Sequence, residues 1–137
     1  MTDLQNAMSL AAMGMRAQGT RMRVISENMA NAETTSLNPG GDPYRRQLVT
    51  FETELNRSND MKEVRVNDII NDDSAFRIKY DPGHPAADDE GYVKLPNVNT
   101  LVEMMDMREA QRSYEANLGI IDMTRSMLTR TIDLLRA

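Results

Sequence analysis

The sequence contains no cysteine and no tryptophan, and it has one histidine, His84. Disulfide scaffolds, thiolate metal sites and thiol nucleophiles are therefore excluded, and a histidine-based metal site or proton relay is not expected. No stretch approaches about 20 uninterrupted apolar residues, so we predict no membrane span. The N-terminus lacks a basic patch followed by an apolar run and a small-residue cleavage site, so we expect no Sec-type signal peptide.

Excess positive charge is also absent. The 137 residues carry 16 basic and 21 acidic side chains, a formal net charge of −5. Nucleic-acid-binding proteins normally show a basic excess or a basic stripe, so we expect no nucleic-acid partner. The length suits one domain, or a small domain with long arms.

Residue types are partitioned along the chain. All five prolines and five of the six aromatic residues lie between positions 39 and 96, whereas eleven of the twelve methionines lie outside that stretch. Methionine favours helices, proline breaks them and aromatic residues favour strands. We therefore predict a mainly α protein with a small β-rich middle: a helical arm over residues 1–36, a loop and β-rich segment over 37–96, and a second helical arm over 97–137.

The first arm has no proline between positions 3 and 32, and its apolar residues follow steps of four and three. This heptad spacing predicts a helix with one apolar seam. Gly14 and Gly19 weaken that helix or mark a close approach of another backbone. The seam consists of Leu4, Met8, Ala11, Met15, Gln18, Met22, Ile25 and Met29.

The second arm follows Pro96. Its start has capping-box spacing at Thr100 and Glu103, although Asn97 or Asn99 could equally cap the helix. A heptad row comprises Met104, Met107, Gln111, Tyr114, Leu118, Ile121, Arg125, Leu128, Ile132 and Leu135. A second apolar row beside it comprises Ala116, Ile120, Met123, Met127 and Leu134.

Helices of these lengths would extend for about 45 and about 60 Å, beyond the roughly 30 Å diameter of a small domain. The middle segment is too small to cover both apolar seams. The arms are therefore expected to pair as a coiled coil with each other, with other copies, or both. Methionine side chains adapt to irregular gaps, which suits packing among non-identical neighbours.

The middle segment shows short β-favouring runs separated by glycine- and proline-containing turns. We expect strands at residues 47–51, 64–66, 76–80 and 91–95. The acidic positions around His84 between residues 81 and 90 lack the ligand spacing of a calcium loop and are interpreted as a solvated turn. Arg45 and Arg46 suit either a contact with an acidic partner or a charge pair at a strand edge. No residue pattern predicts a catalytic site, a cofactor or a resident metal.

Several runs of residues carry a family resemblance. Residues 25–35 (ISENMANAETT) are similar to the N-terminal signature of flagellar rod, hook and related axial proteins. Residues 39–46 (PGGDPYRR), 80–88 (YDPGHPAAD), 91–99 (GYVKLPNVN) and 103–117 (EMMDMREAQRSYEAN) resemble the proximal rod proteins of the bacterial flagellar basal body. The resemblance covers the whole chain, apart from residues 56–79, which add no support.

The resemblance implies a structural subunit of the basal-body rod, which transmits motor torque across the periplasm. It also implies export through the flagellar type III apparatus without cleavage, and helical assembly into a tube whose inner layer is formed by the terminal helices. The implied partners are other copies of the chain, the FlgB and FlgF types of proximal rod protein, the distal rod protein and the FliE adaptor.

On this interpretation the heptad rows form the assembly interface. Two arginines in an exposed loop are expected to meet an acidic surface of a neighbour. The expected interface residues are Leu4, Met8, Met15, Met22, Ile25, Met29, Arg45, Arg46, Met104, Met107, Tyr114, Leu118, Ile121, Leu128, Ile132 and Leu135. Two alternatives stay open: a cytosolic coiled-coil adaptor or export chaperone, and an enzyme that uses the acidic 81–90 loop with a divalent metal.

Overall fold

The computed structural model describes residues 2–57 and 61–136. Along the chain, four strands lie between two helices, in the order α1 (Thr2–Ala30), β1 (Gln47–Asn56), β2 (Met61–Asn71), β3 (Arg77–Tyr80), β4 (Tyr92–Leu95) and α2 (Thr100–Arg136). Met1 and Ala137, the outermost residues of the expected arms, and residues 58–60 of the expected middle segment lie outside the described residues. The prediction of a mainly α protein with a small β-rich middle is confirmed.

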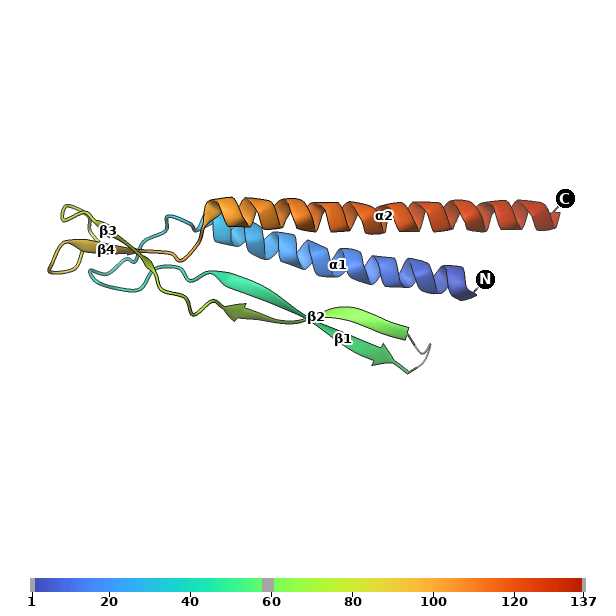
Figure 1. Ribbon diagram of the computed structural model, residues 1–137, viewed down its shortest axis with the longest axis horizontal. Coiled ribbons are helices and arrows are strands. Elements are labelled where there is room, and N and C mark those ends of the chain that lie inside the picture. Colours follow the sequence, from blue (N-terminus) through green and yellow to red (C-terminus); the bar gives the residue numbers. More distant parts are fainter. Residues whose placement is uncertain (1, 58–60, 137) are drawn as a thin grey trace.

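The helices lie side by side and run in opposite directions, with α1 between α2 and the β1–β2 hairpin (Figure 1). In the part of the chain described, α1 packs against α2 on one side and against both strands of the hairpin on the other, while no strand approaches the backbone of α2. The C-terminal turns of α2 extend beyond the start of α1 (Figure 1). The molecule is therefore three layers deep, and α1 is its central layer.

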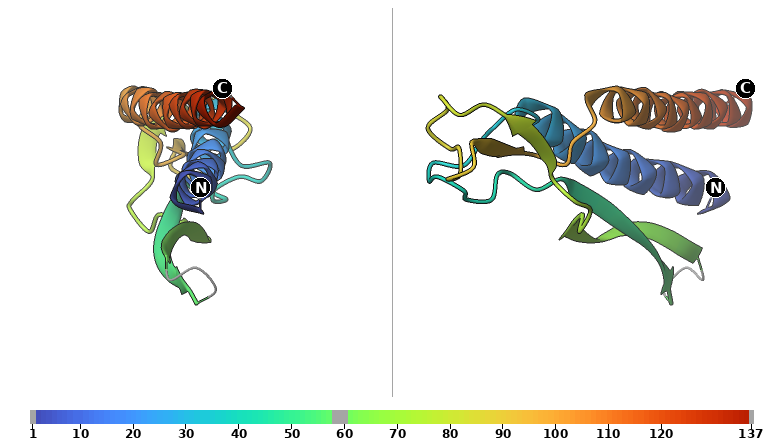
Figure 2. Two further views of the ribbon diagram at one scale, coloured as in Figure 1. Left: turned by 90° about the vertical axis from the view of Figure 1, so that its right-hand side faces the viewer. Right: turned by 60° about the vertical axis from the view of Figure 1, so that its left-hand side comes forward.

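The β residues form two separate antiparallel pairs. β1 pairs with β2 from Gln47 opposite Asn71 to Asn56 opposite Met61, with a bulge between Thr50 and Phe51. These two strands are longer than the predicted runs. The smaller pair, β3–β4, lies with its loops beyond the end of α1 and the start of α2. This is the opposite end of the molecule from both termini (Figures 1 and 2). The middle segment thus has one part beside the helices and one part beyond them.

The predicted start of the last strand is one residue early. Gly91 has a φ of 86°, in the left-handed region, and a Cβ atom there would lie 3.0 Å from atoms of Pro82 and Tyr80. Glycine is the residue that adopts this conformation without steric cost, so it closes the turn before β4 rather than opening the strand.

Asn99, one of the three residues considered, caps α2. Its Oδ1 accepts a hydrogen bond from the backbone N–H of Leu101 at 3.1 Å, which satisfies one of the free donors at the helix start. The alternative capping box is wrong, because Glu103 turns inward to contact other elements. Asn97, the third candidate, instead accepts the backbone N–H of Arg46 at 2.8 Å.

The buried face of α2 lies partly beside the predicted row. Residues Glu103, Ala110 and Thr124 are buried, and Met107, Tyr114, Asn117, Ile121 and Leu128 are half-buried. This face repeats at steps of four and three, as predicted, but alternate positions are shifted by one residue from the expected row. At three of these positions the cause is close packing, because Ala110, Asn117 and Thr124 are smaller than Gln111, Leu118 and Arg125 of the expected row. Glu103 is buried because it bonds to Arg46 and Asn28. None of the helices in the described ranges is both long enough and apolar enough to cross a membrane.

Candidate functional site

The predicted seam of α1 is covered within the chain. Ile25 is buried, and Leu4, Met8, Met15, Met22 and Met29 are all half-buried. The opposite side of α1 is also occupied, because Ala17 and Val24 are buried on the side that lines cavities against the hairpin. Helix α1 therefore has few apolar side chains left for a partner.

The predicted row of α2 divides into two sets. Met107, Tyr114, Ile121 and Leu128 are half-buried. The remaining predicted residues are exposed: Met104, Leu118, Ile132 and Leu135. The structure brings the first set to the helix pair and leaves the second set uncovered.

The second apolar row of α2 is exposed along its whole length. Met123 is 64% exposed and Leu134 is 79% exposed. Val102 and Met105, which the sequence reasoning did not select, are exposed on the same side nearer the start of the helix, where Glu109 and Arg112 separate them from Ala116. We call this set the outer row: Val102, Met105, Ala116, Ile120, Met123, Met127 and Leu134.

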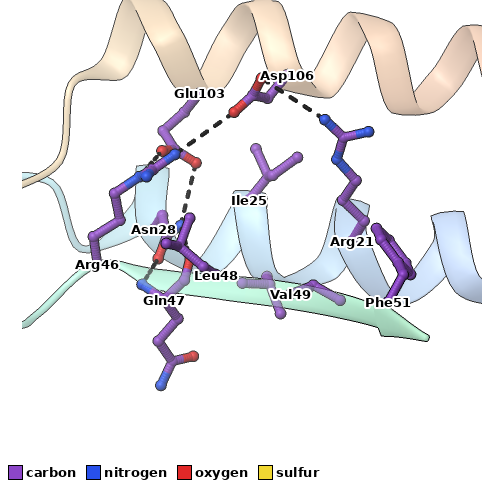
Figure 3. A pocket seen from close by; sticks show the side chains of 11 residues that line it. Arg21, Ile25, Asn28, Arg46, Gln47, Leu48, Val49, Phe51, Glu103 and Asp106 are labelled. Carbon is purple, nitrogen blue, oxygen red and sulfur yellow. Dashed lines mark hydrogen bonds and ion pairs between the residues drawn. The ribbon is translucent and has the colours of Figure 1, made fainter. Parts of the chain in front are cut away.

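A buried polar cluster lies where α1, α2 and the start of β1 meet (Figure 3). Asn28 is 1% exposed and uses all of its hydrogen-bonding capacity. Its Nδ2 donates to the carbonyl of Gln47 at 2.8 Å and to Glu103 Oε2 at 3.2 Å. Its Oδ1 accepts the backbone N–H of Gln47 and the hydroxyl of Tyr44, both at 2.9 Å. The Asn28 amide thus pairs with Gln47 much as a neighbouring strand would.

Glu103 is the acidic centre of this cluster and is fully buried. Its Oε1 accepts a hydrogen bond from Arg46 Nε at 2.5 Å. Burial by itself would lower the pKa of Arg46, but its hydrogen bonds and charge interactions with Glu103 and Asp72 outweigh that effect and raise it. The buried Glu103 carboxylate depends on this pair, because removing Arg46 would leave it with only the neutral Asn28 amide as a hydrogen-bond donor.

Tyr44 remains a proton donor in this setting. Burial raises the pKa of its hydroxyl above the usual value, and the negative charges of Glu27 and Glu103 raise it further. A cavity of about 300 Å³ opens beside the cluster, and its lining includes the apolar side chains of Ile25 and Val49 (Figure 3). Val24 also lines it.

The expectation of an exposed arginine loop is wrong for Arg46. Its side chain is 17% exposed and forms ion pairs with Glu103, Asp72 at 3.3 Å and Asp106 at 3.6 Å, all within the chain. Arg45 is half-buried; its guanidinium lies 4.3 Å from the centre of the Phe76 ring and donates to the carbonyl of Asp72 at 3.0 Å. The acidic surface that meets Arg46 is therefore internal.

The acidic turn around His84 is held by local hydrogen bonds. His84 Nδ1 accepts the backbone N–H of Ala86 at 3.0 Å, and Asp88 Oδ1 accepts those of Glu90 and Tyr92 at 3.0 and 2.8 Å. Within residues 2–57 and 61–136, no group of three or more histidine and carboxylate side chains is placed to hold a metal ion. These contacts account for the residue types as turn formers.

Comparison with known proteins identifies the family. Residues 89–134, which include nearly all of α2, match the family described as flagellar basal body rod FlgEFG protein C-terminal. The flagellar basal-body rod protein FlgC of Agrobacterium fabrum is 51% identical over 137 residues, which is 100% of this chain and 99% of that protein. The chain belongs to the FlgC family of flagellar basal-body rod proteins. It is a structural protein of the basal-body rod.

Two more distant FlgC proteins match over nearly the same length. The relative from Aquifex aeolicus is 42% identical, over 97% of this chain and 98% of its own length. The relative from Escherichia coli O157:H7 is 36% identical, over 96% of this chain and 97% of its own length. The resemblance inferred from the sequence motifs is therefore confirmed across both helices and the middle segment, and the family is a structural one rather than a family of enzymes.

Proposed function

We propose that this FlgC-family chain enters the rod through its terminal helices, which pair with each other as a coiled coil and pack through α2 against helices of neighbouring subunits, and so transmit torque. The observation that carries the proposal is the outer row of α2. Its apolar side chains from Ala116 to Leu134, and those of Val102 and Met105 nearer the start of the helix, are exposed among the residues that the structure describes. Exposed apolar side chains gathered on one side of a helix indicate an interaction surface.

The size of the effect supports assembly. Full burial of one Met, Leu or Ile side chain contributes about 1.5–3 kcal/mol, and the outer-row residues are about half exposed in the chain. Covering Ile120, Met123 and Met127 together would therefore contribute several kcal/mol per subunit, on the order of 3. Because methionine adapts to irregular surfaces, one such row can pack against neighbours of different sequence.

The proposed neighbours are other copies of the chain, the FlgB and FlgF types of proximal rod protein, the distal rod protein and the FliE adaptor. The family description that matches α2 is named for FlgE, FlgF and FlgG proteins, which supports the idea that different rod subunits present a similar C-terminal helix. We assign Met104, Leu118, Ile132 and Leu135 to contacts with a second neighbouring subunit, because they are exposed on α2 but do not lie on the outer row. The half-buried predicted residues are assigned to the helix pair beneath it: Leu4, Met8, Met15, Met22, Ile25, Met29, Met107, Tyr114, Ile121 and Leu128.

The test introduces one carboxylate on the outer row and one on the polar face of the same helix. Met123→Asp places the charge in the proposed interface, and Ser126→Asp places it at an exposed polar position three residues later. We expect cells carrying Met123→Asp to lose motility and to lack this subunit in isolated basal bodies, whereas Ser126→Asp keeps both. Equal incorporation of the two variants would contradict the proposal. A cytosolic adaptor or chaperone would be missing from wild-type basal bodies as well.

Export through the flagellar type III apparatus belongs to the same proposal, because a rod subunit must leave the cytoplasm to reach the rod. Mass spectrometry of the chain in isolated basal bodies should find the α1 segment intact, apart from removal of Met1. A mature chain that begins at or after Ala12 would contradict uncleaved export.

A further inference from the structure

The α1–α2 seam repeats itself after seven residues. Met8, Met15, Met22 and Met29 occupy successive heptads of α1, and Met107, Tyr114, Ile121 and Leu128 do so on α2. If α1 moved along α2 by one heptad, about 10 Å, most methionines would be replaced by methionines. Methionine also tolerates changes of partner, so apolar packing alone specifies this register poorly.

Two contacts along the seam do not repeat. At the junction, Asn28 Nδ2 donates to Glu103 Oε2 at 3.2 Å, and both residues are buried. Further along, the amide of Asn117 lies against Gly14, where a Cβ atom would be 2.9 Å from Asn117 Nδ2. The Asn117 side chain is held in that place because Nδ2 donates to the carbonyl of Ser113 at 3.0 Å. We call these the two register contacts.

The register contacts have matched spacing. They are 14 residues apart on α1 (28 minus 14) and 14 residues apart on α2 (117 minus 103), which is two heptads on each helix. Both are therefore satisfied together in one antiparallel register. A shift by one heptad would bring Ala7 or Arg21 to the place of Gly14, and both carry the Cβ atom for which Asn117 leaves no room.

We infer that Asn28–Glu103 and Gly14–Asn117 are positioning contacts that select one register of the helix pair. The same Asn28 side chain binds both backbone groups of Gln47 at the start of β1. The register of the helices is thereby linked to the hairpin. The outer row of α2 consequently has one fixed position along the axis of α1. A buried polar residue in an otherwise apolar seam commonly has this role in coiled coils. Only the role of this fixed position in contacts with neighbouring subunits rests on the proposed function.

Cysteine cross-linking can read the register directly because the chain contains no cysteine of its own. The register contacts bring Ala11 level with residues 120 and 121 of α2, and of these two Ile121 lies on the half-buried side that faces α1. Ala11→Cys with Ile121→Cys should therefore form a disulfide on oxidation of the purified chain. A pair displaced by one heptad, Ala11→Cys with Leu128→Cys, should not. Appearance of the displaced product at a comparable yield in the otherwise unchanged chain would overturn the inference.

The register contacts are then altered with matched controls. Gly14→Asn puts a second amide where Asn117 already lies, whereas Gly19→Asn makes the same change at a glycine with nothing within 4 Å. We expect Gly14→Asn to raise the ratio of displaced to native product by about tenfold, and Gly19→Asn to leave it unchanged. The exchange Gly14→Asn with Asn117→Gly should restore the native product, because the sizes again match.

The second register contact is tested by Glu103→Leu, which should also favour the displaced product. Should that chain fail to fold, the glycine series decides alone, since it leaves the charges untouched. Equal ratios for Gly14→Asn and Gly19→Asn, or no restoration by the exchange, would overturn the inference. Cross-linking of the purified chain needs no rod, so these outcomes are independent of whether the proposed function holds.

Discussion

Helices α1 and α2 have the same kind of apolar spacing but different surroundings. Helix α1 lies between α2 and the β1–β2 hairpin, so both of its sides are covered (Figures 1 and 2). Helix α2 packs on α1, and its outer row is exposed. The contrast shows that heptad spacing identifies an apolar face without identifying what covers it. In this subunit α1 uses its apolar side chains within the fold, whereas α2 has further exposed apolar side chains that we assign to assembly.

The largest expected difference between the two helices is their response to an introduced carboxylate. Val24 is 1% exposed on α1, so Val24→Asp buries a charge without a partner and should lower the free energy of unfolding by about 4 kcal/mol or more. Met123→Asp on α2 should change it by less than about 0.5 kcal/mol, as is usual for exposed sites. Urea unfolding of the two purified variants followed by circular dichroism measures both values. Similar losses would mean that the outer row is already covered in the isolated chain.

The junction where the two helices meet should be nearly as sensitive. Glu103→Ala removes the carboxylate that accepts from both Arg46 and Asn28, and leaves Arg46 with Asp72 and Asp106. We expect a loss of about 3 kcal/mol in the free energy of unfolding, the lower end of the range for breaking a buried ion pair.

Glu103→Gln is the matched control for that measurement because it keeps the shape and one acceptor oxygen while removing the charge. It should cost less than Glu103→Ala in the same urea titration. If the alanine variant were as stable as the wild type, Glu103 would not hold the junction together.

Replacing one glycine in each helix by alanine should have a smaller effect, which tests the intrinsic stability of the two helices. A Cβ atom added at Gly19 in α1 or at Gly119 in α2 would have nothing within 4 Å, so alanine fits at either site. Gly19→Ala and Gly119→Ala should each raise the free energy of unfolding by about 0.5–1 kcal/mol, because alanine favours the helix. Urea unfolding of each variant measures the gain. A gain in only one helix would show that the other is not formed in the isolated chain.

The smallest expected effect is the pH dependence of Asp72. The backbone N–H of Ser74 is the main cause of the lowered pKa of this carboxyl, with further contributions from the Ser74 hydroxyl and Arg46. A carboxyl with a lower pKa in the folded state stabilises the fold above its unfolded pKa of about 3.9, and loses that contribution as the pH falls through the folded value.

Asp72→Asn should therefore be less stable than the wild type by less than about 1 kcal/mol near pH 7, since the site is partly exposed. The difference should shrink as the pH falls below about 4. Urea titrations well above and well below that pH measure it, and a difference that grows toward acid would contradict the assignment.

Much of the fold was predictable from local properties of the chain. The absence of proline before position 39 and after position 96 predicted both helices, and the runs at 76–80 and 91–95 predicted β3 and β4 to within one residue. These features depend on backbone preferences of neighbouring residues, which short stretches of sequence carry. The motifs at 25–35 and 39–46 also identified the family.

Tertiary structure alone decided how the predicted faces are used. Glu103 was interpreted as a capping residue and Arg46 as an exposed one, yet they meet in a buried pair although 57 positions separate them. Likewise, the covered face of α2 includes Ala110 and Asn117 rather than Gln111 and Leu118, because Gly14 lets the two helices approach closely there. Periodicity places residues on a common face of one helix, but which face is buried depends on the size and charge of side chains that only folding brings together.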